Sequence, residues 1–559
     1  MNPRALRVGT PLLPLFLLLG CGGSSSNRHS DPAINNVTLN LVGQFEKRVL
    51  TPSGLSASTT VMPARYCYVE ILGSGGAGVL SSGFLGNLGT ASTEVPAGSQ
   101  VTMVLYPQFE VPAGTGTDFF FHGSVKNAAP AAAYADITAF NAVPNWSVSS
   151  DTIAATSNGT LTVKALNSSP NREAGAFNIA DQAVSFAQTV QALEPALRLP
   201  NLHVFWQGGS SATGFPALAT SGTGALLRQA SGRAVFQMPV GRAATGTLFT
   251  GVDEFNDGIL QQRFASLLFA PYSYPGDGSA PDAVIRGDND TFGQTSRGYQ
   301  GESTAAFKTG FCDFFSAAVR NSNSLVELDT TGQPSTFYLD VHDRTYFPHA
   351  AGQGEFYSDA VAVSLYGIWK TSLGGGAPGL QTLWNATFAS APGALLNAPL
   401  GCYPTYLTGL AQGVTASAWT SILGQLALED ILDVTSPAYF AGNALWTTQS
   451  KPFSLTGALK TYSAATGIYY DRNQAQATRF TQAVQGPCTL TMTPLDGQDF
   501  YLELIGHNGV VAGSYDRRTS AQPRTLSFTT LPAGTYAVRV RVGYTSADVA
   551  AARYTLAVN

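Results

Sequence analysis

The segment Asp253–Leu268, with the sequence DEFNDGILQQRFASLL, is the stretch around which the fold of this chain is interpreted. Its apolar residues recur at three- and four-residue spacing, which places them on one face of a helix. They are Phe255, Ile259, Leu260, Phe264, Leu267 and Leu268. Asp253, Asn256 and Asp257 stand at the start of the segment, where capping side chains and carboxylates stabilise free backbone N–H groups. The pattern therefore predicts an amphipathic helix packed on a hydrophobic core.

The same segment resembles the active-site helix of secreted bacterial zinc metallopeptidases of the zincin type, whose pattern is D-E-[FY]-D-D-x-V-I-x-H-E-[FY]-G-H. The positions that match are Asp253, Glu254, Phe255, Asp257, Ile259, Leu260 and Phe264. The two histidine positions fall on Gln262 and Ser266, and the glutamate between them falls on Arg263. The resemblance implies a metallopeptidase-like helix that lacks the residues of the zinc site.

The three replacements remove the chemistry of that motif. Its histidines bind zinc from one helix face, and its glutamate acts as general base on the zinc-bound water. Gln262 offers a neutral amide and Ser266 a neutral hydroxyl, which are poor zinc ligands. Arg263 keeps its proton near neutral pH, so it is no base, and its positive charge repels a dication.

The position of the third zinc ligand is also changed. The segment Ser303–Phe315 resembles the "A-F-x-E-G-[WF]-x-x-x-F" helix of these peptidases, and Thr309 holds the place of its glutamate. A catalytic zinc needs three protein ligands and a water. With all three ligands and the base replaced, we predict that no zinc is bound and that the chain is an inactive homologue of the family.

Four further blocks resemble the same peptidases, in the same order along the chain. They are Gly175–Asp181 at the start of a predicted helix that ends near Pro195, Leu199–Trp206 as a strand, Phe356–Trp369 as a helix, and Thr408–Leu432 as the final helices. The resemblance thus spans roughly residues 36–440 in scattered blocks, and it implies a zincin-like, mainly helical domain over residues 169–443.

Residues 1–20 have the layout of a secretory signal peptide, with Arg4 and Arg7 before a short apolar stretch. The stretch is too short for a membrane span, which takes roughly 20 residues. Leu18-Leu19-Gly20-Cys21 resembles the bacterial lipobox, which implies cleavage before Cys21 and lipidation of its thiol. Residues 21–35 are expected to form a flexible tether. A plain signal peptide is the alternative; the lipoprotein interpretation predicts a membrane anchor at Cys21 and a location in the cell envelope.

The composition fits an exported, β-rich protein of about three domains. Of 559 residues, 12% are charged, about half of the roughly 25% that is usual, and glycine and phenylalanine are abundant. The formal net charge is −5, and removal of residues 1–20 takes away two arginines and no acid, so it becomes −7. No basic region suited to nucleic acid is present.

Four cysteines besides Cys21 lie far apart: Cys67, Cys312, Cys402 and Cys488. No C-x-x-C occurs, which argues against a zinc ribbon or a thioredoxin-type motif. In an oxidising compartment a Cys312–Cys402 disulfide is the favoured pairing, because both residues fall within one predicted domain. Four buried free thiols are the alternative.

Short alternating strands and glycine-rich turns predict a β-sandwich at each end of the chain. Over residues 36–168, the segment Met62–Ile71 resembles a strand of the prealbumin-like domains that precede such peptidases. Over residues 444–559, strands such as Phe500–Ile505 and Tyr536–Val542 resemble the jelly-roll-like, pre-peptidase C-terminal sandwich of secreted peptidases. The expected fold class is therefore α+β, with a helical domain between two sandwiches.

Other candidate sites are weaker. Asp288–Gly293 resembles the start of a calcium loop, but Phe292 and Tyr299 stand where oxygen ligands belong. The local cluster that contains His342, His349 and Glu355 is best interpreted as a solvated loop, and His203 as a structural strand residue.

No G-x-S-x-G elbow or P-loop occurs, although a serine triad assembled from distant residues stays open. The leading function is a surface lipoprotein that binds a protein, peptide or glycan through the former substrate cleft. A hydrolase with a relocated active site and a structural envelope component are the alternatives.

Overall fold

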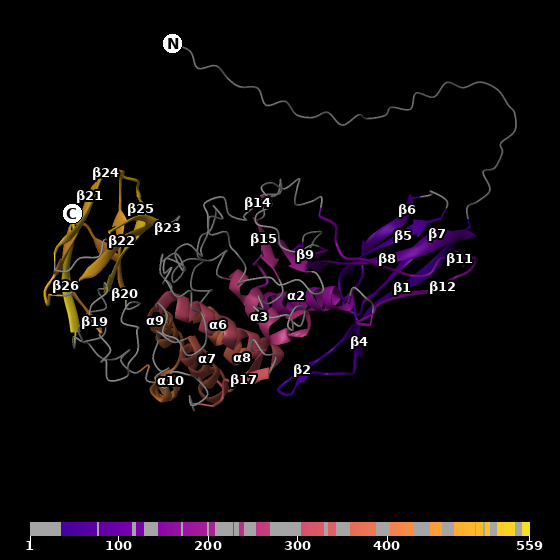
Figure 1. Cartoon of the computed structure of the whole chain (residues 1–559), viewed down its shortest axis with the longest axis horizontal. Helices are drawn as coiled ribbons and strands as arrows, with labels where there is room; N and C mark the ends of the chain where they lie inside the picture. Colours follow the sequence, from indigo (N-terminus) through magenta and orange to yellow (C-terminus); the bar gives the residue numbers. More distant parts are fainter. Residues whose placement is uncertain are drawn as a thin grey trace, which may run out of the picture.

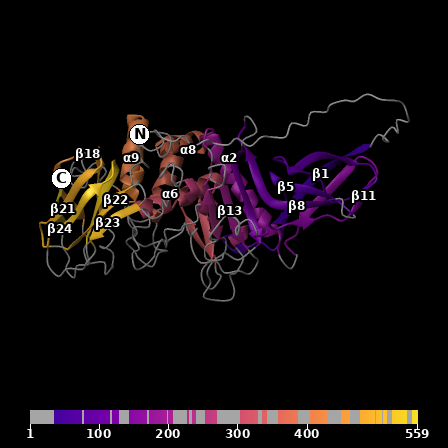
Figure 2. The same cartoon turned by 90° about the horizontal axis from the view of Figure 1, so that it is seen from above.

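The computed structural model arranges the described part of the chain as a row of β strands, helices and β strands (Figures 1 and 2). The structure describes residues 35–74, 78–114, 119–127, 143–168, 172–197, 199, 201–206, 227–228, 234–239, 253–268, 303–328, 334–341, 358–386, 403–429, 431, 448–460, 475–497, 499–506, 509–514, 522–542 and 551–559. The class is mixed α and β with a β-rich N-terminal region, as the sequence predicts. No helix within the described residues is long and apolar enough to cross a membrane.

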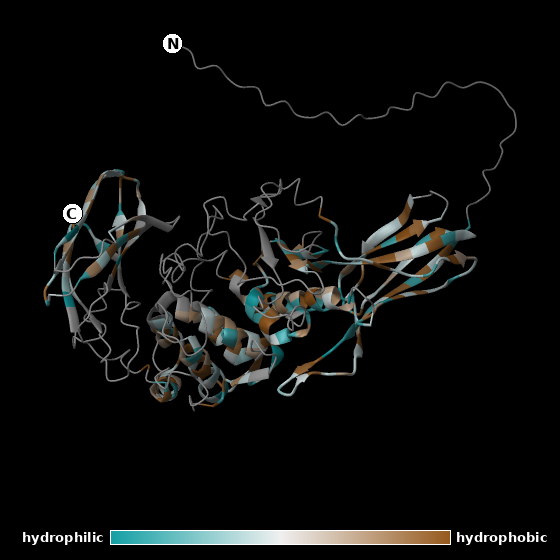
Figure 3. Cartoon of the chain, in the orientation of Figure 1, coloured by the Kyte–Doolittle hydropathy of each residue, from teal (hydrophilic) through white to brown (hydrophobic). Residues whose placement is uncertain are grey.

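The N-terminal β region consists of two facing sheets and a separate pair of two-residue strands. Its strands are β1 (Asn36–Lys47), β2 (Leu50–Thr51), β3 (Gly54–Leu55), β4 (Thr60–Pro63), β5 (Cys67–Gly73), β6 (Gly78–Phe84), β7 (Thr90–Pro96), β8 (Ser99–Pro112), β9 (Phe119–Asn127), β10 (Val148–Ser149), β11 (Ile153–Ala155) and β12 (Gly159–Ala165). In one sheet β1 pairs with β12, β4 and β7, and in the other β5 lies between β6 and β8. Every second residue of β1 from Val37 to Phe45 is buried, because alternate side chains face the space between the sheets, and only Lys47 at the end of this series is half-buried. Figure 3 shows this alternation of hydropathy along the strands.

The central region contains β13 (Asn201–Trp206), β14 (Leu227–Arg228), β15 (Ala234–Pro239), β16 (Ser324–Leu328) and β17 (Pro334–Tyr338). Its helices and helical turns are α2 (Ala174–Leu193), η1 (Asp253–Phe255), α3 (Asp257–Ala265), η2 (Ser266–Leu268), α6 (Ser303–Arg320), α7 (Ser358–Gly367), η3 (Ile368–Ser372), α8 (Gly376–Trp384), α9 (Tyr403–Gly413) and α10 (Ala416–Leu428). The helices expected near Ala174 and from Asp253 are confirmed.

One sheet continues from the N-terminal β region into the central region. Its order is β14-β15-β13-β9-β8-β5-β6, and β13 runs parallel to both β9 and β15. A predicted domain boundary lies between residues 168 and 169, and strands from both sides of it belong to this sheet. Phe120, Phe121 and Val125 of β9 pack in the same core as α2 and α6. The N-terminal β region and the helices are therefore joined through shared strands.

The C-terminal β region has a core of its own. Its strands are β18 (Thr448–Ser450), β19 (Phe453–Lys460), β20 (Ala475–Gln482), β21 (Gly486–Pro494), β22 (Phe500–Gly506), β23 (Gly509–Ser514), β24 (Arg524–Leu531), β25 (Gly534–Val542) and β26 (Ala551–Val558). They form two sheets, β18-β20-β25-β22-β23 and β19-β26-β21-β24. The described residues of its hydrophobic core run from Phe480 to Val558, all within the region.

Candidate functional site

The helix predicted over Asp253–Leu268 is present, with a 3₁₀ turn at each end of α3. Asn256 caps α3, because its Oδ1 accepts a hydrogen bond from Ile259 N at 3.2 Å. Its Nδ2 donates to Val326 O at 2.9 Å and so fixes the start of the helix against β16. Of the predicted apolar face, Leu260, Phe264, Leu267 and Leu268 are buried in the central core and Phe255 in the core of the N-terminal β region. Ile259, which is predicted on the same face, is half-buried.

Gln262, at the first predicted ligand position, lies in the interface between α3 and α6. Its Nε2 donates a hydrogen bond to Asp313 Oδ1, and both side chains are buried. Because the carboxylate can only accept, this contact fixes which end of the amide faces α6. Ser316 Oγ adds a second link by donating to Gly258 O at 2.7 Å. Gln262 therefore holds two helices together.

Thr309 precedes Asp313 by four residues on α6, so the two side chains share a helix face. Thr309 is 8% exposed and Gln262 is 7% exposed. The structure thus places the first and third predicted ligand positions on two helices that pack together, and the hydrogen bond from Gln262 to Asp313 joins these helices. Arg263 is half-buried on α3, and Ser266 lies in η2, with its side chain outside the described part of the structure.

The residues at these positions do not fit zinc. Zinc in proteins takes imidazole, thiolate and carboxylate ligands, whereas Gln262 and Thr309 present an amide and a hydroxyl. The carboxylate in this interface, Asp313, accepts the hydrogen bond of Gln262. Among the described residues no group of three or more His, Cys, Asp or Glu side chains is placed to hold a metal ion.

Glu254, which matches the peptidase pattern, is a buried anchor for the N-terminal half of α2. Its side chain is 0% exposed and forms an ion pair with Arg172. Its carbonyl oxygen accepts a hydrogen bond from Asn178 Nδ2 at 2.7 Å. Neither Arg172 nor Asn178 carries a sequence signal for this contact, because both lie about 80 residues upstream. The motif acid is therefore part of the packing between η1 and α2.

His203 lies on β13 beside β9, and Ser124 Oγ is 2.7 Å from its Nδ1. Both side chains are buried, and the His122 ring lies 6.3 Å from the His203 ring. Burial first, and then the charges of Lys126 and His122, hold the pKa of His203 well below its usual value of 6.5. The imidazole is therefore neutral at physiological pH. The sequence predicts a structural role for His203 and gives no sign of its contact with Ser124.

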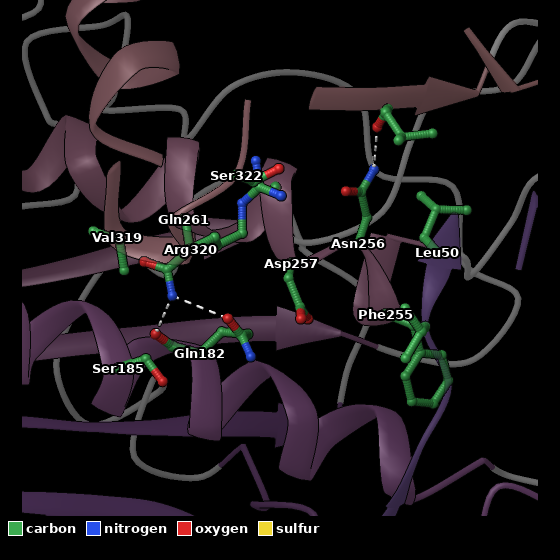
Figure 4. Close-up of a pocket in the computed structure, with 13 residues that line it drawn as sticks. Leu50, Gln182, Ser185, Phe255, Asn256, Asp257, Gln261, Val319, Arg320 and Ser322 are labelled. Carbon is green, nitrogen blue, oxygen red and sulfur yellow. Dashed lines mark hydrogen bonds between the residues drawn. The ribbon is translucent and has the colours of Figure 1, made fainter. Parts of the chain in front are cut away.

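A pocket of about 370 Å³ opens between the N-terminal β region and the helices. Figure 4 shows it, with Gln182 and Ser185 from α2, Asp257 and Gln261 from α3, and Arg320 from α6. The other lining residues are Val49, Leu50, Phe255, Asn256, Gly258, Val319, Ser322 and Val326. Sequence analysis missed this pocket, because its lining comes from segments that are far apart in the chain.

Charged groups border the pocket on two sides. Asp257 is 28% exposed and pairs with Lys47 of β1 at 2.5 Å. Arg320 donates from Nε to Ser316 O at 3.2 Å and from Nη2 to Ser324 O at 2.7 Å. Burial lowers the pKa of Arg320, and the nearby carboxylate of Asp257 opposes that shift. Arg320 stays cationic because its usual pKa is far above neutral.

Several sequence-based predictions lie outside the described residues. They concern the lipidation site Cys21, the calcium loop at Asp288, the cluster with His342, His349 and Glu355, and Cys402. The Cys312–Cys402 disulfide therefore stays a prediction.

Cys67 and Cys488 are buried and carry free thiols, one in each β region. Burial raises the pKa of the Cys67 thiol, so this residue is an unreactive part of the core.

Comparisons with known proteins assign no family. No protein-family model matches the chain, and no curated protein matches it. A pre-peptidase C-terminal domain of collagenase from Bacillus anthracis is 12% identical over 20% of this chain and 93% of that one, with a TM-score of 0.15. PliG from Aeromonas hydrophila, a periplasmic inhibitor of g-type lysozyme, is 13% identical over 19% of this chain and 84% of that one, with a TM-score of 0.13. Likenesses this weak assign neither a fold nor a function.

Proposed function

We propose that this chain is an exported lipoprotein that binds a protein, peptide or glycan at the cell envelope and has no peptidase activity. In this proposal the central region is a zincin-like domain that has lost its zinc site. The N-terminal β region is a prealbumin-like sandwich, and the C-terminal one is a jelly-roll-like sandwich that assists binding. The anchor is the lipid on Cys21.

The observation that carries the proposal is the buried hydrogen bond between Gln262 and Asp313. An amide at the first ligand position is committed to holding α3 against α6, and Thr309 lies on the same face of α6 as Asp313. A zinc ligand has its lone pair directed at the ion, whereas here the amide nitrogen of Gln262 faces a carboxylate. This arrangement supports a packed helix interface in place of a metal centre.

Metal analysis and a proteolysis assay on the purified full chain test the loss of activity. We expect less than one zinc per chain after incubation with zinc and dialysis, and no chelator-sensitive cleavage of casein or peptides. A matched variant with Gln262→His, Arg263→Glu, Ser266→His and Thr309→Glu restores the three ligand positions and removes the repelling charge. It is expected to gain zinc binding. Stoichiometric zinc in the unmodified chain would overturn the proposal.

The lipid anchor is tested separately by Cys21→Ala. Stable attachment to a membrane needs more than one acyl chain, which lipoprotein processing supplies at this cysteine. We expect the variant to move from the membrane fraction to the soluble fraction, whereas Cys67→Ala, which changes a buried thiol, leaves the protein attached. Retention of an unlipidated Cys21→Ala protein in membranes would contradict the anchor.

A second candidate function is a hydrolase with a relocated active site, and one contact favours it. The hydroxyl of Ser124 lies 2.7 Å from a neutral imidazole nitrogen of His203, which is the distance between a nucleophile and its base. The 2% exposure of Ser124 favours the binding function instead, because a nucleophile must reach its substrate. A fluorophosphonate probe that labels the full chain, but not Ser124→Ala, would decide for the hydrolase.

A further inference from the structure

The pocket between the N-terminal β region and the helices offers polar atoms that the fold leaves unused. Gln261 is 0% exposed, and its Nε2 donates to Gln182 O at 2.8 Å and to Gln182 Oε1 at 3.0 Å. A backbone carbonyl can only accept, so the amide nitrogen of Gln261 must face it. The atom left over is Gln261 Oε1, a buried acceptor without a hydrogen-bond partner. Such an atom costs free energy unless something else donates to it.

Two hydrogen-bond donors line the same pocket. Gln182 Oε1 accepts from Gln261, so the Nε2 group of Gln182 is turned the other way, and within the described residues it forms no hydrogen bond. Arg320 uses Nε and Nη2 for backbone carbonyls, and its Nη1 likewise forms none within the described residues. Neither nitrogen is among the buried atoms that lack a hydrogen-bond partner, so both nitrogens are accessible to solvent. The pocket therefore presents a guanidinium edge and an amide N–H group.

The remaining walls are a carboxylate and aliphatic side chains. Asp257 forms an ion pair with Lys47, and this pair offsets part of the negative charge that Asp257 places near Arg320. Leu50, Val319 and Val326 supply the apolar surface. Phe255 is 1% exposed, so it gives no aromatic platform for a sugar ring.

We infer that this pocket binds the carboxyl end of a peptide that finishes in small aliphatic residues. The terminal carboxylate lies against Arg320 Nη1 and Gln182 Nε2, because a guanidinium edge and an amide N–H suit a carboxylate. A small aliphatic side chain of the peptide contacts Val319 and Val326. The volume of about 370 Å³ lies near the lower end of the roughly 300–1,000 Å³ of small-molecule sites, which suits one or two residues.

This site is independent of the loss of zinc. Gln261 and Asp257 share one face of α3, whereas Gln262 is directed toward Asp313 on α6. A chain that turned out to bind zinc would still have the pocket, and a chain without zinc could still lack the peptide site. The two conclusions therefore fail separately.

Calorimetric titration of the full chain with N-acetyl-alanyl-alanine tests the inference, with the C-terminal amide of the same dipeptide as the matched ligand. We expect the acid to bind about 10-fold or more tightly than the amide, because a charge-assisted hydrogen bond is lost in the amide. Inorganic phosphate is expected to compete weakly. Equal binding of acid and amide, or no binding of the acid at millimolar concentration, would overturn the inference.

Two variants place the binding in this pocket. Arg320→Gln removes the charge, and Gln182→Glu keeps an acceptor for Gln261 while turning the free donor into a repelling carboxylate. Each is expected to weaken binding of the acid about 10-fold or more. Arg263→Gln, on another part of α3, is the matched control and leaves binding unchanged. If Arg320→Gln fails to fold, Gln182→Glu alone decides, and unchanged affinity in that variant refutes the site.

Discussion

The two β regions at the ends of this chain differ in how they are attached to the rest of it. The N-terminal β region shares a sheet with β13 and β15, and its core takes in Ala174 and Phe177 of α2 and Phe255 of η1. The hydrophobic core described for the C-terminal β region contains residues of that region alone. Both regions are built of similar short strands. Whether a β region is joined to the helices therefore depends on whether one of its outer strands pairs with a strand of the central region.

Ion pairs follow the same division. Two ion pairs, Lys47–Asp257 and Arg65–Asp181, join the N-terminal β region to the helices. A third, Arg172–Glu254, joins the segment that leads into α2 to η1. Arg539–Glu503 and Arg524–Asp499, by contrast, lie inside the C-terminal β region. The N-terminal β region and the helices are thus expected to unfold as one unit, and the C-terminal β region as another.

The largest expected effect comes from cutting the chain at these two junctions. Residues 446–559 expressed alone are expected to fold with a cooperative thermal transition, because the described residues of their hydrophobic core all lie within this segment. Residues 36–168 alone are expected to lack one, because Phe109, Phe120, Phe121 and Val125 lose the helices that bury them. Circular dichroism on heating measures both.

Residues 36–445 are the control for this comparison and are expected to keep the first transition of the full chain. A cooperative transition in residues 36–168, at the temperature seen in the full chain, would show that the shared sheet adds no stability.

Removal of one partner of a buried ion pair is expected to have the next largest effect. Arg539→Met leaves Glu503 charged and 0% exposed, and Arg172→Met leaves Glu254 in the same state. Each loss is expected to cost about 3–5 kcal/mol, because a buried carboxylate loses its ion-pair partner. Calorimetry should show Arg539→Met lowering the transition of the C-terminal β region and Arg172→Met lowering the other one. Arg553→Met, which breaks an exposed pair with Asp496, is the mild control.

The smallest expected effect is a pH dependence from His203. Its pKa is lowered in the folded chain below the usual 6.5, so the unfolded chain takes up a proton first as the pH falls. The stability of the N-terminal and helical unit is full above pH 6.5 and is lost as the pH falls from there toward the lowered pKa. The slope is at most about 1.4 kcal/mol per pH unit for one proton.

His203→Gln is expected to flatten this slope between pH 6.5 and pH 5, as measured by thermal unfolding in a pH series. The transition of the C-terminal β region should not respond to the variant. An identical pH profile of the variant and the unmodified chain would show that the pKa of His203 is the same in the folded and unfolded states.

Local patterns in the sequence predict the elements well. The apolar spacing in Asp253–Leu268 and the run from Ala174 to Pro195 give α3 and α2, because helical periodicity and capping are properties of neighbouring residues. Alternation in segments such as Phe500–Ile505 gives strands for the same reason. The predicted replacement of zinc ligands also needs only the residue types at positions 262, 266 and 309.

Contacts between distant segments are another matter. The packing of α2, α3 and α6 decides which side chains meet. It brings Gln262 to Asp313 and Glu254 to Arg172, and it places Gln182, Gln261 and Arg320 around one pocket. Nothing in the local pattern of either partner signals such a pair. The domain boundaries also depend on such distant contacts. In the sequence β9 has the pattern of an ordinary sandwich strand, and only the structure shows that it pairs with β13 of the central region.

The sequence by itself determined where helices and strands form and which chemical groups stand at positions 262, 266 and 309, because both depend on residue identity and short-range spacing. The tertiary structure alone decided which polar groups are buried together, which amide and guanidinium atoms stay available, and which β region shares its core with the helices. Those outcomes depend on the three-dimensional packing of segments that are 50 to 100 or more residues apart, where burial and hydrogen bonding are settled by all neighbours at once.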